Sequence, residues 1–277
     1  MPLKEYSFYL SEITDEKLEI LIAFLSESGF DSFQTDEAGL HAYTNIKMET
    51  GKIKELLNNP VFSSLDLTFK SRNLPEKNWN EEWERAYQPV IIEGMCSIVA
   101  PFHKKTRTKY KVVIDPKMSF GTGHHETTRL MVKQMLGTDL MGKTVLDIGC
   151  GTGVLGILAI KLGAKFVTAI DIDNWACENS YENYRRNAIL RDQFEVIRGN
   201  SNVIPDKNYH TILANINRNV LMADMKKYRS FLEQNGQLII SGVLTSDREL
   251  IMESAKESGF QPISELMENN WLSIAMN

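Results

Sequence analysis

The chain has 277 residues, of which 43% are hydrophobic and 24% are charged, a composition typical of a globular protein with one or two domains. The formal net charge of −5 argues against a protein that coats nucleic acid. Hydrophobic runs are too short for a membrane span, and residues 1–25 lack the pattern of a signal peptide. Cys96, Cys150 and Cys177 form no C-x-x-C pair, so we expect a cytoplasmic protein without a disulfide framework or a zinc site.

Residues 1–70 are expected to form a small domain of their own. Segments with strand and helix periodicity follow one another there in the order βαββαβ, which predicts a ferredoxin-like α+β fold. The expected strands are Tyr6–Leu10, Phe30–Thr35, Leu40–Tyr43 and Leu65–Phe69, and the expected helices run from Thr14 or Asp15 to Gly29 and from Lys47 to Asn59. This domain shows no catalytic constellation, and its lone His41 is interpreted as a structural or surface residue.

Residues 71–89 are polar and charged and are expected to link this domain to the next. Trp79, Trp83 and Tyr87 recur every four residues, so a helix would carry all three on one face. The simplest interpretation is a linker helix whose aromatic side chains pack on the following domain. A partner-binding or hinge face is the alternative.

Residues 90–277 alternate between strand and helix patterns and then end in a pair of strands. This order predicts an α/β domain with a doubly wound, Rossmann-like parallel sheet that contains one antiparallel strand. Among its elements we expect single strands at Ile91–Pro101 and Tyr110–Ile114, a helix that ends at Gln234, and a closing hairpin of Phe260–Leu266 and Trp271–Ala275.

The most informative stretch of this domain runs from Thr144 to Asp171. A short hydrophobic strand is followed by Gly149, Gly151 and Gly153, which mark a tight turn into a buried helix. Asp171 ends the next strand, at about the distance where a Rossmann-type unit binds a ribose diol. The stretch therefore predicts a site for a nucleoside-containing cofactor, and an α/β crossover that binds no ligand is the alternative.

A second informative stretch, Asp115–Thr128, contains the flexible turn Gly121-Thr-Gly123 followed by two histidines and Glu126. These side chains are adjacent in sequence rather than four residues apart, so they do not form an H-E-x-x-H metal helix. We expect a loop that closes over a cofactor, followed by a helix that begins at Thr127 or Thr128.

The glycine pattern allows two cofactors. Gly151-Thr-Gly153-Val-Leu-Gly156 fits the G-x-G-x-x-G pattern of nicotinamide dinucleotide sites. The segment D-I-G-C-G-T-G, which begins at Asp147, resembles motif I of S-adenosylmethionine (SAM) methyltransferases, in which the turn faces the methionine half of the cofactor. The acid two residues before the first glycine favours SAM.

Several motifs together resemble one family. F-G-T-G-H-H-E-T-T (Phe120–Thr128), I-D-I-D (Ile170–Asp173), A-N-I (Ala214–Ile216) and the W-N-E-E-W linker are similar to those of bacterial ribosomal protein L11 methyltransferases, over nearly the whole chain. The resemblance implies a SAM-dependent enzyme that methylates lysine side chains and the α-amine of this protein of the large-subunit stalk base. It also implies a substrate-recognition domain at 1–70, a linker helix at 71–89 and a methyltransferase domain at 90–277. We expect a monomer that binds neither nucleic acid nor membrane.

The same resemblance implies which residues hold the cofactor. By position, Thr128, Gly149, Asp171 and Asn215 would contact SAM, with Asp171 on both ribose hydroxyls. Gly149 and Gly151 would leave room for the methionine end. A further candidate is Asn200, which could face the adenine, although a turn role is equally open.

The candidate catalytic residues are Asn215, Phe120 and His124. A lysine amine has a pKa of about 10.4 in water and must lose a proton before it attacks a methyl group. We expect Asn215 and its neighbouring backbone to orient this amine, while the Phe120–His125 loop lines the methyl-transfer channel. His124 is the candidate general base, but a structural or loop-gating role is favoured.

Three other functions compete with this prediction. A nucleic-acid amine methyltransferase would carry an aromatic residue after Asn215, but the sequence there is Asn215-Ile-Asn217-Arg218. A replacement of Asp171 or Asn215 would favour a non-catalytic SAM-binding module, but both residues are present. An NAD oxidoreductase would differ in its cofactor, so a cofactor titration would identify it.

Overall fold

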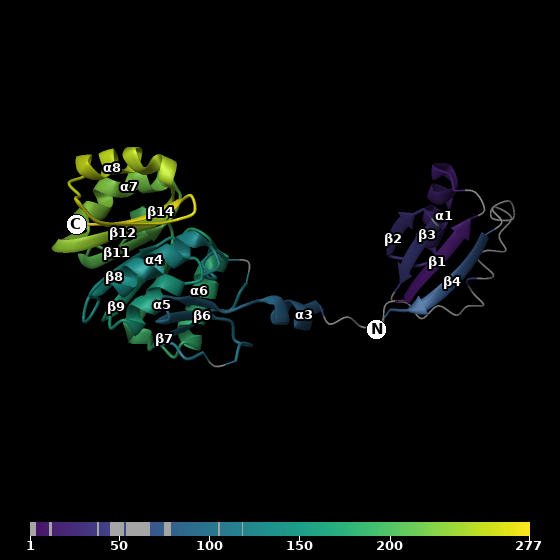
Figure 1. The fold of residues 1–277 in the computed structure, drawn as a ribbon, viewed down its shortest axis with the longest axis horizontal. Helices are drawn as coiled ribbons and strands as arrows, with labels where there is room; N and C mark the ends of the chain where they lie inside the picture. The colour runs from purple at the N-terminus through teal and green to yellow at the C-terminus, as the bar shows by residue number, and fades with distance from the viewer. Residues whose placement is uncertain are drawn as a thin grey trace. The chain divides into compact units, whose positions relative to one another are not determined.

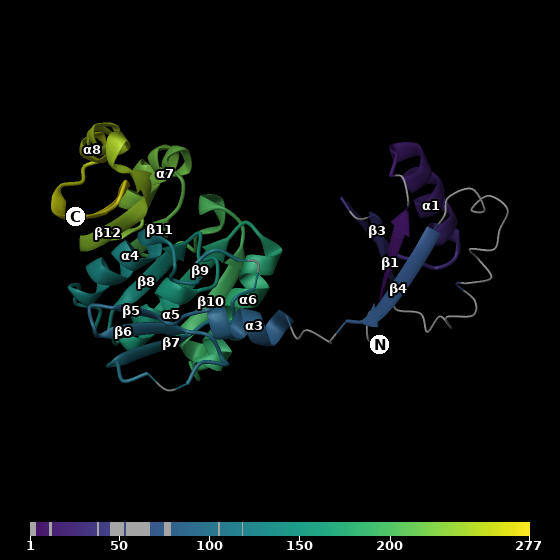
Figure 2. The ribbon, with the colours of Figure 1, turned by 45° about the vertical axis from the view of Figure 1, so that its right-hand side comes forward.

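The computed structural model describes residues 4–10, 13–37, 39–44, 53, 67–74, 79–104, 106–117 and 119–277, with the backbone alone for 79–82. The chain forms two compact units, Met1–Ala86 and Tyr87–Asn277. Figures 1 and 2 show the elements of each unit from two directions.

The smaller unit contains a four-stranded antiparallel sheet in the order β2-β3-β1-β4. Its elements are β1 Lys4–Leu10, α1 Asp15–Glu27, β2 Ser32–Asp36, β3 Gly39–Thr44, β4 Leu67–Asn73 and α3 Trp79–Ala86. Helix α1 begins after Thr14, whose side chain accepts a hydrogen bond from the Lys17 backbone N–H. The buried side chains of α1 are Leu18, Leu21 and Leu25, which pack in one core with residues of β1 and β3. This sheet order confirms the expected ferredoxin-like α+β class.

Three expectations for this part of the chain need comment. The helix expected at Lys47–Asn59 lies outside the described residues, apart from the buried Ile53. Strand β4 continues to Asn73 rather than ending at Phe69, because Lys70–Asn73 pair with the first half of β1. Helix α3 ends at Ala86, so Tyr87 follows the helix instead of lying on it.

The larger unit contains a seven-stranded sheet and a three-stranded sheet. The strands of the large sheet are β8 Thr144–Ile148, β9 Phe166–Asp171, β10 Phe194–Arg198, β11 Tyr209–Asn215, β12 Leu232–Leu244, β13 Pro262–Glu268 and β14 Trp271–Met276, and those of the small sheet are β5 Val90–Ile92, β6 Cys96–Val99 and β7 Tyr110–Val113. The helices are α4 Glu126–Leu136, α5 Val154–Lys161, α6 Asn174–Arg186, α7 Arg218–Ser230 and α8 Arg248–Glu257, with short 3₁₀ turns η2 Arg191–Gln193, η3 Ser201–Val203 and η4 Thr245–Asp247. None of the helices described is long and hydrophobic enough to cross a membrane.

The large sheet has the order β10-β9-β8-β11-β12-β14-β13. Strand β14 runs antiparallel to both of its neighbours, while the pairs from β10 to β12 are all parallel. This confirms the predicted doubly wound sheet with one antiparallel strand. The strand order reverses between β8 and β11, and at such a point the carboxyl ends of the strands open a crevice for ligands.

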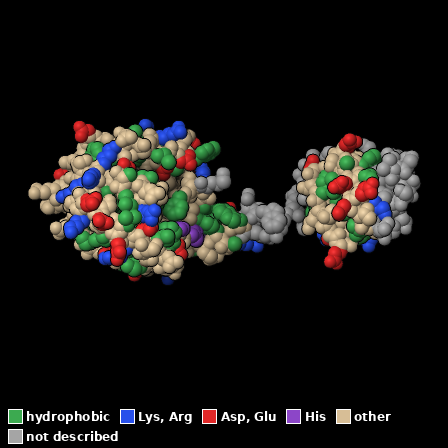
Figure 3. All heavy atoms as spheres, turned by 90° about the horizontal axis from the view of Figure 1, so that it is seen from above, with side chains coloured by type: hydrophobic (Ala, Val, Ile, Leu, Met, Phe, Trp, Pro, Cys, Tyr) green, Lys and Arg blue, Asp and Glu red, His purple; other side chains and the backbone are tan. Residues whose placement is uncertain are grey.

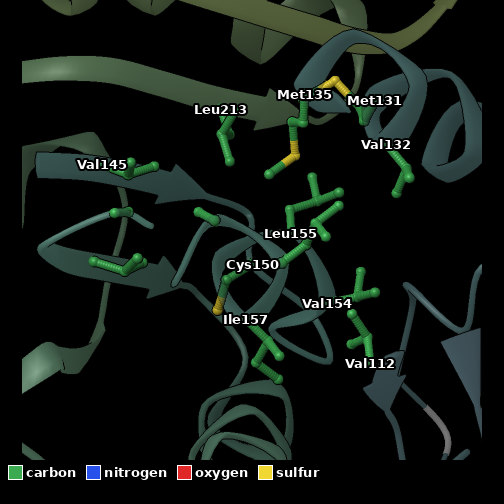
Figure 4. Close-up of a cluster of buried hydrophobic side chains, with 14 of the residues drawn as sticks. Val112, Met131, Val132, Met135, Val145, Cys150, Val154, Leu155, Ile157 and Leu213 are labelled. Atoms are coloured by element: carbon green, nitrogen blue, oxygen red, sulfur yellow. The ribbon is translucent and has the colours of Figure 1, made fainter. Parts of the chain in front are cut away.

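Two hydrophobic cores cover the two faces of this sheet. Successive residues of β8 point to opposite faces, so Val145 lies in one core and Leu146 in the other. Helices α7 and α8 cover one face, and α4 and α5 cover the other (Figures 1 and 2). Figure 4 shows the core that contains Val145, where side chains of α4, α5, β7, β8 and β11 converge. Helix α5 is buried on nearly all sides, so contacts with its neighbours hold it against the sheet.

Two expected elements of the larger unit have different bounds. Ile91–Pro101 is not one strand but a hairpin of β5 and β6, because Glu93 and Gly94 both adopt positive φ and reverse the chain. The helix expected to end at Gln234 is α7, which ends at Ser230. Leu232 already pairs with Tyr209 and therefore begins β12.

The contact between α5 and α6 gives a test of packing. A Cβ atom at Gly156 of α5 would lie 1.9 Å from the Tyr184 hydroxyl, which is buried and has no hydrogen-bond partner among the described residues. We expect Gly156→Ala to lower the free energy of unfolding by about 1–3 kcal/mol, because the added methyl group overpacks the core. Tyr184→Phe alone should change it little, and the double variant should recover about 1 kcal/mol or more of the loss. Urea denaturation of all four proteins measures this coupling, and strictly additive changes would contradict it.

Candidate functional site

The turn after β8 is restricted to glycine at three alternate positions. Gly149, Gly151 and Gly153 have φ angles of 67°, 52° and 77°, which residues with a side chain rarely adopt. A Cβ atom at Gly149 would lie 2.3 Å from Ile216, and one at Gly151 would lie 2.3 Å from the Phe120 carbonyl oxygen. The turn therefore lies in close contact with the end of β11 and with the loop before α4.

Asp171, at the end of β9, fixes this turn in place. Its Oδ2 accepts a hydrogen bond from the Gly151 N–H at 2.9 Å, and its Oδ1 accepts one from the Asp173 N–H at 3.0 Å. A carboxylate has about four acceptor positions, so two remain for other donors. Asp171 thus holds the turn in position and can still bind hydroxyl groups.

A cavity of about 480 Å³, which we call the glycine-turn cavity, lies at the carboxyl ends of β8 to β11. Gly149, Asp171 and Asn200 line it, together with hydrophobic side chains that include Ile172, which is 71% exposed. Its volume is in the range of small-molecule sites. Asn200 also caps η3, because its side chain accepts a hydrogen bond from the Asn202 N–H at 3.0 Å.

A second cavity of about 240 Å³, the Asn215 hollow, adjoins the first. Its lining residues are Phe120, His125, Thr127, Asn215, Ile216, Asn217, Gly242 and Trp271. The rings of Phe120 and His125 are 5.3 Å apart, and those of His125 and Trp271 are 4.9 Å apart, so three aromatic rings form one wall. Ile216 and Asn217 line both cavities.

The β13–β14 hairpin brings Trp271 to this wall. Glu268 accepts hydrogen bonds from Arg129 at 2.7 Å and from Lys133 at 3.0 Å, and Asn269 donates one to Glu126 at 2.9 Å. These contacts attach the hairpin to the first turns of α4.

The structure brings together six of the eight predicted site residues. Gly149, Asp171 and Asn200 line the glycine-turn cavity, and Phe120 and Asn215 line the Asn215 hollow. Gly151 is part of the turn itself, where its N–H donates a hydrogen bond to Asp171.

The remaining two predicted residues, Thr128 and His124, do not line either cavity. Thr128 is fully buried in α4, and its hydroxyl has no hydrogen-bond partner within the described part of the chain. His124 is exposed and contacts Tyr87 instead. Helix α4 begins at Glu126, with His125 as its cap, rather than at Thr127 or Thr128.

Trp271 and Gly242 are cavity residues that sequence reasoning missed. A Cβ atom at Gly242 would lie 2.3 Å from the Ile216 carbonyl oxygen, so this strand position is restricted to glycine. The isolated glycine inside the hydrophobic run of β12 was the available signal, because such a glycine often marks a close approach of backbone. Trp271 belongs to no motif, and only the tertiary fold places it here.

Asp147 supports the turn from below. It is fully buried, and its Oδ2 accepts a hydrogen bond from the Gly156 N–H at 3.0 Å, in the first turn of α5. Burial raises the pKa of Asp147 to about 7. Its Oδ1 has no hydrogen-bond partner among the described residues.

In the described part of the chain, no three His, Cys, Asp or Glu side chains are grouped so that they could hold a metal ion.

Comparisons with known proteins give a consistent result. Residues 11–277 match the family described as "Ribosomal protein L11 methyltransferase (PrmA)". A Porphyromonas gingivalis protein named "Ribosomal protein L11 methyltransferase" is 41% identical over 97% of this chain and 95% of its own length. A protein of the same name from Phocaeicola vulgatus is 37% identical over 99% of this chain and 98% of its own length. The crystal structure of a ribosomal protein L11 methylase from Lactobacillus delbrueckii subsp. bulgaricus matches with a TM-score of 0.64 and 27% identity, covering 69% of this chain and 98% of that one.

The buried Asp147 gives a pH-dependent prediction. Between the usual carboxyl pKa of about 4 and the raised value of about 7, the folded protein binds more protons here than the unfolded chain does. The contribution of Asp147 to stability therefore falls as pH rises through this window, by at most about 1.4 kcal/mol per pH unit. We expect Asp147→Asn to gain stability relative to wild type between pH 5 and pH 8, as measured by urea denaturation. Thr128→Val also changes a buried polar group, but this group does not titrate. Its free energy of unfolding should therefore differ from that of wild type by the same amount at every pH. A constant difference for Asp147→Asn would contradict the prediction.

Proposed function

This chain belongs to the ribosomal protein L11 methyltransferase family, and on that premise we propose that it methylates lysine side chains and the α-amine of ribosomal protein L11. The observation that carries this proposal is that the glycine-turn cavity and the Asn215 hollow share Ile216 and Asn217. A cofactor in the first cavity and an amine in the second would meet at these two residues.

The glycine-turn cavity fits S-adenosylmethionine, the cofactor of this enzyme class. Asp171 has acceptor positions for both ribose hydroxyls after binding two backbone N–H groups. The absence of a side chain at Gly149 lets the turn backbone approach a ligand closely. Asn200 and the exposed Ile172 provide polar and hydrophobic contacts for the adenine. When bound, S-adenosylmethionine supplies a methyl group on a sulfonium sulfur, which the lone pair of an amine can attack.

The Asn215 hollow is the proposed amine site. Its volume of about 240 Å³ accommodates a lysine side chain, and the rings of Phe120, His125 and Trp271 offer a surface for the alkyl stem. Asn215 lies at the end of β11, where its side-chain and backbone oxygens can accept the N–H bonds of the amine.

Positioning and desolvation would supply most of the catalysis. Enclosure by the aromatic wall lowers the pKa of a bound lysine amine, because burial disfavours the charged form. The amine then loses a proton to water, and Asn215 aims its lone pair at the cofactor side of the hollow. No general base is required by this arrangement.

The smaller unit is the proposed recognition domain for ribosomal protein L11, and Trp79–Ala86 forms the helix that leads to the catalytic unit. We further propose a monomeric enzyme that acts in the cytoplasm on this protein of the stalk base. The three cysteines are all unpaired, which suits a reducing compartment.

Asp171→Asn tests the cofactor site. The asparagine keeps the size of the side chain but loses one acceptor oxygen and the charge, so we expect the KM for S-adenosylmethionine to rise about 10- to 100-fold, the equivalent of about 1.5–3 kcal/mol for a hydrogen bond to a charged group. Steady-state methylation of ribosomal protein L11, followed by intact-mass spectrometry, measures this change. Asp173→Asn is the matched control, because Asp173 caps α6 and does not line the cavity. Equal effects of the two substitutions would refute the assignment.

Asn215→Ala tests the amine site. Loss of the side chain leaves the amine poorly oriented, and we expect kcat to fall about 100-fold while the Kd for S-adenosylmethionine changes much less. Mass spectrometry of the methylated protein gives kcat, and calorimetry gives the Kd. Asn219→Ala, on an exposed position of α7, should leave both values unchanged. A normal kcat in Asn215→Ala would exclude this residue from the amine site.

A further inference from the structure

Tyr87, the first residue of the larger unit, lies among three aromatic side chains. Its ring is 5.8 Å from His103 in a stacked arrangement, 4.6 Å from His124 edge-on, and 6.0 Å from Phe102 edge-on. We call Tyr87, Gln88, His103 and His124 the junction cluster. Figure 3 shows histidine side chains at the surface of the larger unit, beside hydrophobic ones.

Two imidazoles bind consecutive backbone carbonyls in this cluster. His103 Nε2 lies 2.6 Å from the Tyr87 oxygen, and His124 Nε2 lies 3.0 Å from the Gln88 oxygen. His103 Nδ1 accepts the Ala100 N–H at 2.9 Å, so its proton is on Nε2. The Gln88 carbonyl can only accept a hydrogen bond, so His124 also donates through Nε2. Each histidine therefore acts as a hydrogen-bond donor to the junction.

The loop that carries His124 is attached to the glycine turn at its other end. The Thr152 N–H donates to the Phe120 carbonyl at 2.9 Å, and the Thr152 hydroxyl donates to the Gly121 carbonyl at 2.7 Å. Phe120 and His125, at the two ends of the loop, both line the Asn215 hollow. The backbone carbonyl of His124 accepts a hydrogen bond from Arg129 of α4. A displacement of the junction cluster would therefore move two of the three rings in the aromatic wall of the hollow.

We propose that His124 is a positioning residue, which with Tyr87 and His103 fixes the Phe120–His125 loop to the point where the chain enters the catalytic unit. Its effect on methyl transfer is thus indirect, through the shape of the Asn215 hollow. The part of this inference that concerns activity rests on the function proposed above.

The geometry disfavours the alternative role of His124 as general base. Its side chain does not line the Asn215 hollow, and its Nε2 is bound to the Gln88 carbonyl. Its Nδ1 faces the Thr122 hydroxyl at 3.3 Å, within the loop itself. A base role would need the ring to leave both partners.

The first experiment compares His124→Gln with His124→Ala in the full chain. A glutamine amide can donate to the Gln88 carbonyl as the imidazole does, but it cannot take up a proton at neutral pH. We expect kcat/KM for ribosomal protein L11 within about threefold of wild type for His124→Gln, and a loss of tenfold or more for His124→Ala. Equal, severe losses in kcat for both variants would overturn the proposal in favour of a base. His210→Gln, at an exposed histidine outside the junction cluster, is the matched control.

The second experiment does not depend on catalysis. Hydrogen–deuterium exchange of the full chain is measured over residues 86–90 and 119–126, in wild type, His124→Ala and Tyr87→Leu. We expect each substitution to raise exchange in both segments, because either one removes the contact between the Tyr87 and His124 rings. His210→Gln should raise exchange in neither segment. Exchange that rises only at the substituted segment would overturn the proposal, whether or not the protein methylates ribosomal protein L11.

Discussion

The hydrogen bond between the Gly151 N–H and the Asp171 carboxylate organises the catalytic unit. It connects the ends of two neighbouring parallel strands, and it can form only because the turn after β8 has the positive φ angles of glycine. Asp147 reinforces the turn from the buried side by binding the first turn of α5. Asp171 and Asp147 thus hold the backbone on either side of the turn in the conformation that leaves a cavity at the carboxyl ends of the strands.

A series of contacts connects this turn to the Asn215 hollow. Phe120 binds Thr152 of the turn, and the loop that follows ends at His125, which caps α4. Helix α4 in turn holds the β13–β14 hairpin through Arg129 and Lys133. The glycine-turn cavity is therefore built around the turn that Asp171 holds, whereas the aromatic wall of the Asn215 hollow combines residues of the loop before α4 with Trp271 of β14.

Local sequence predicted those features whose cause is local. The three glycines, Asp171 and the hydrophobic strands before them determine the turn, which forms one side of the glycine-turn cavity. Trp271 and the partners of His124 depend on contacts between distant segments, which periodicity and spacing do not encode. The burial of Thr128 in α4 likewise depends on tertiary packing, and its predicted contact with the cofactor stays a prediction. The hairpin at Glu93-Gly94 was missed because glutamate rarely adopts positive φ, so the turn carried no usual signal.

The bond between Arg129 and Glu268 joins residues 139 positions apart. Contacts of such long sequence separation form late in folding, because closing a long loop costs entropy before it brings any stabilisation. The glycine turn, by comparison, closes within the short segment between β8 and β9. Local unfolding of the β13–β14 hairpin would remove Trp271 from the Asn215 hollow and leave every residue that lines the glycine-turn cavity in place, so the two cavities can be lost separately.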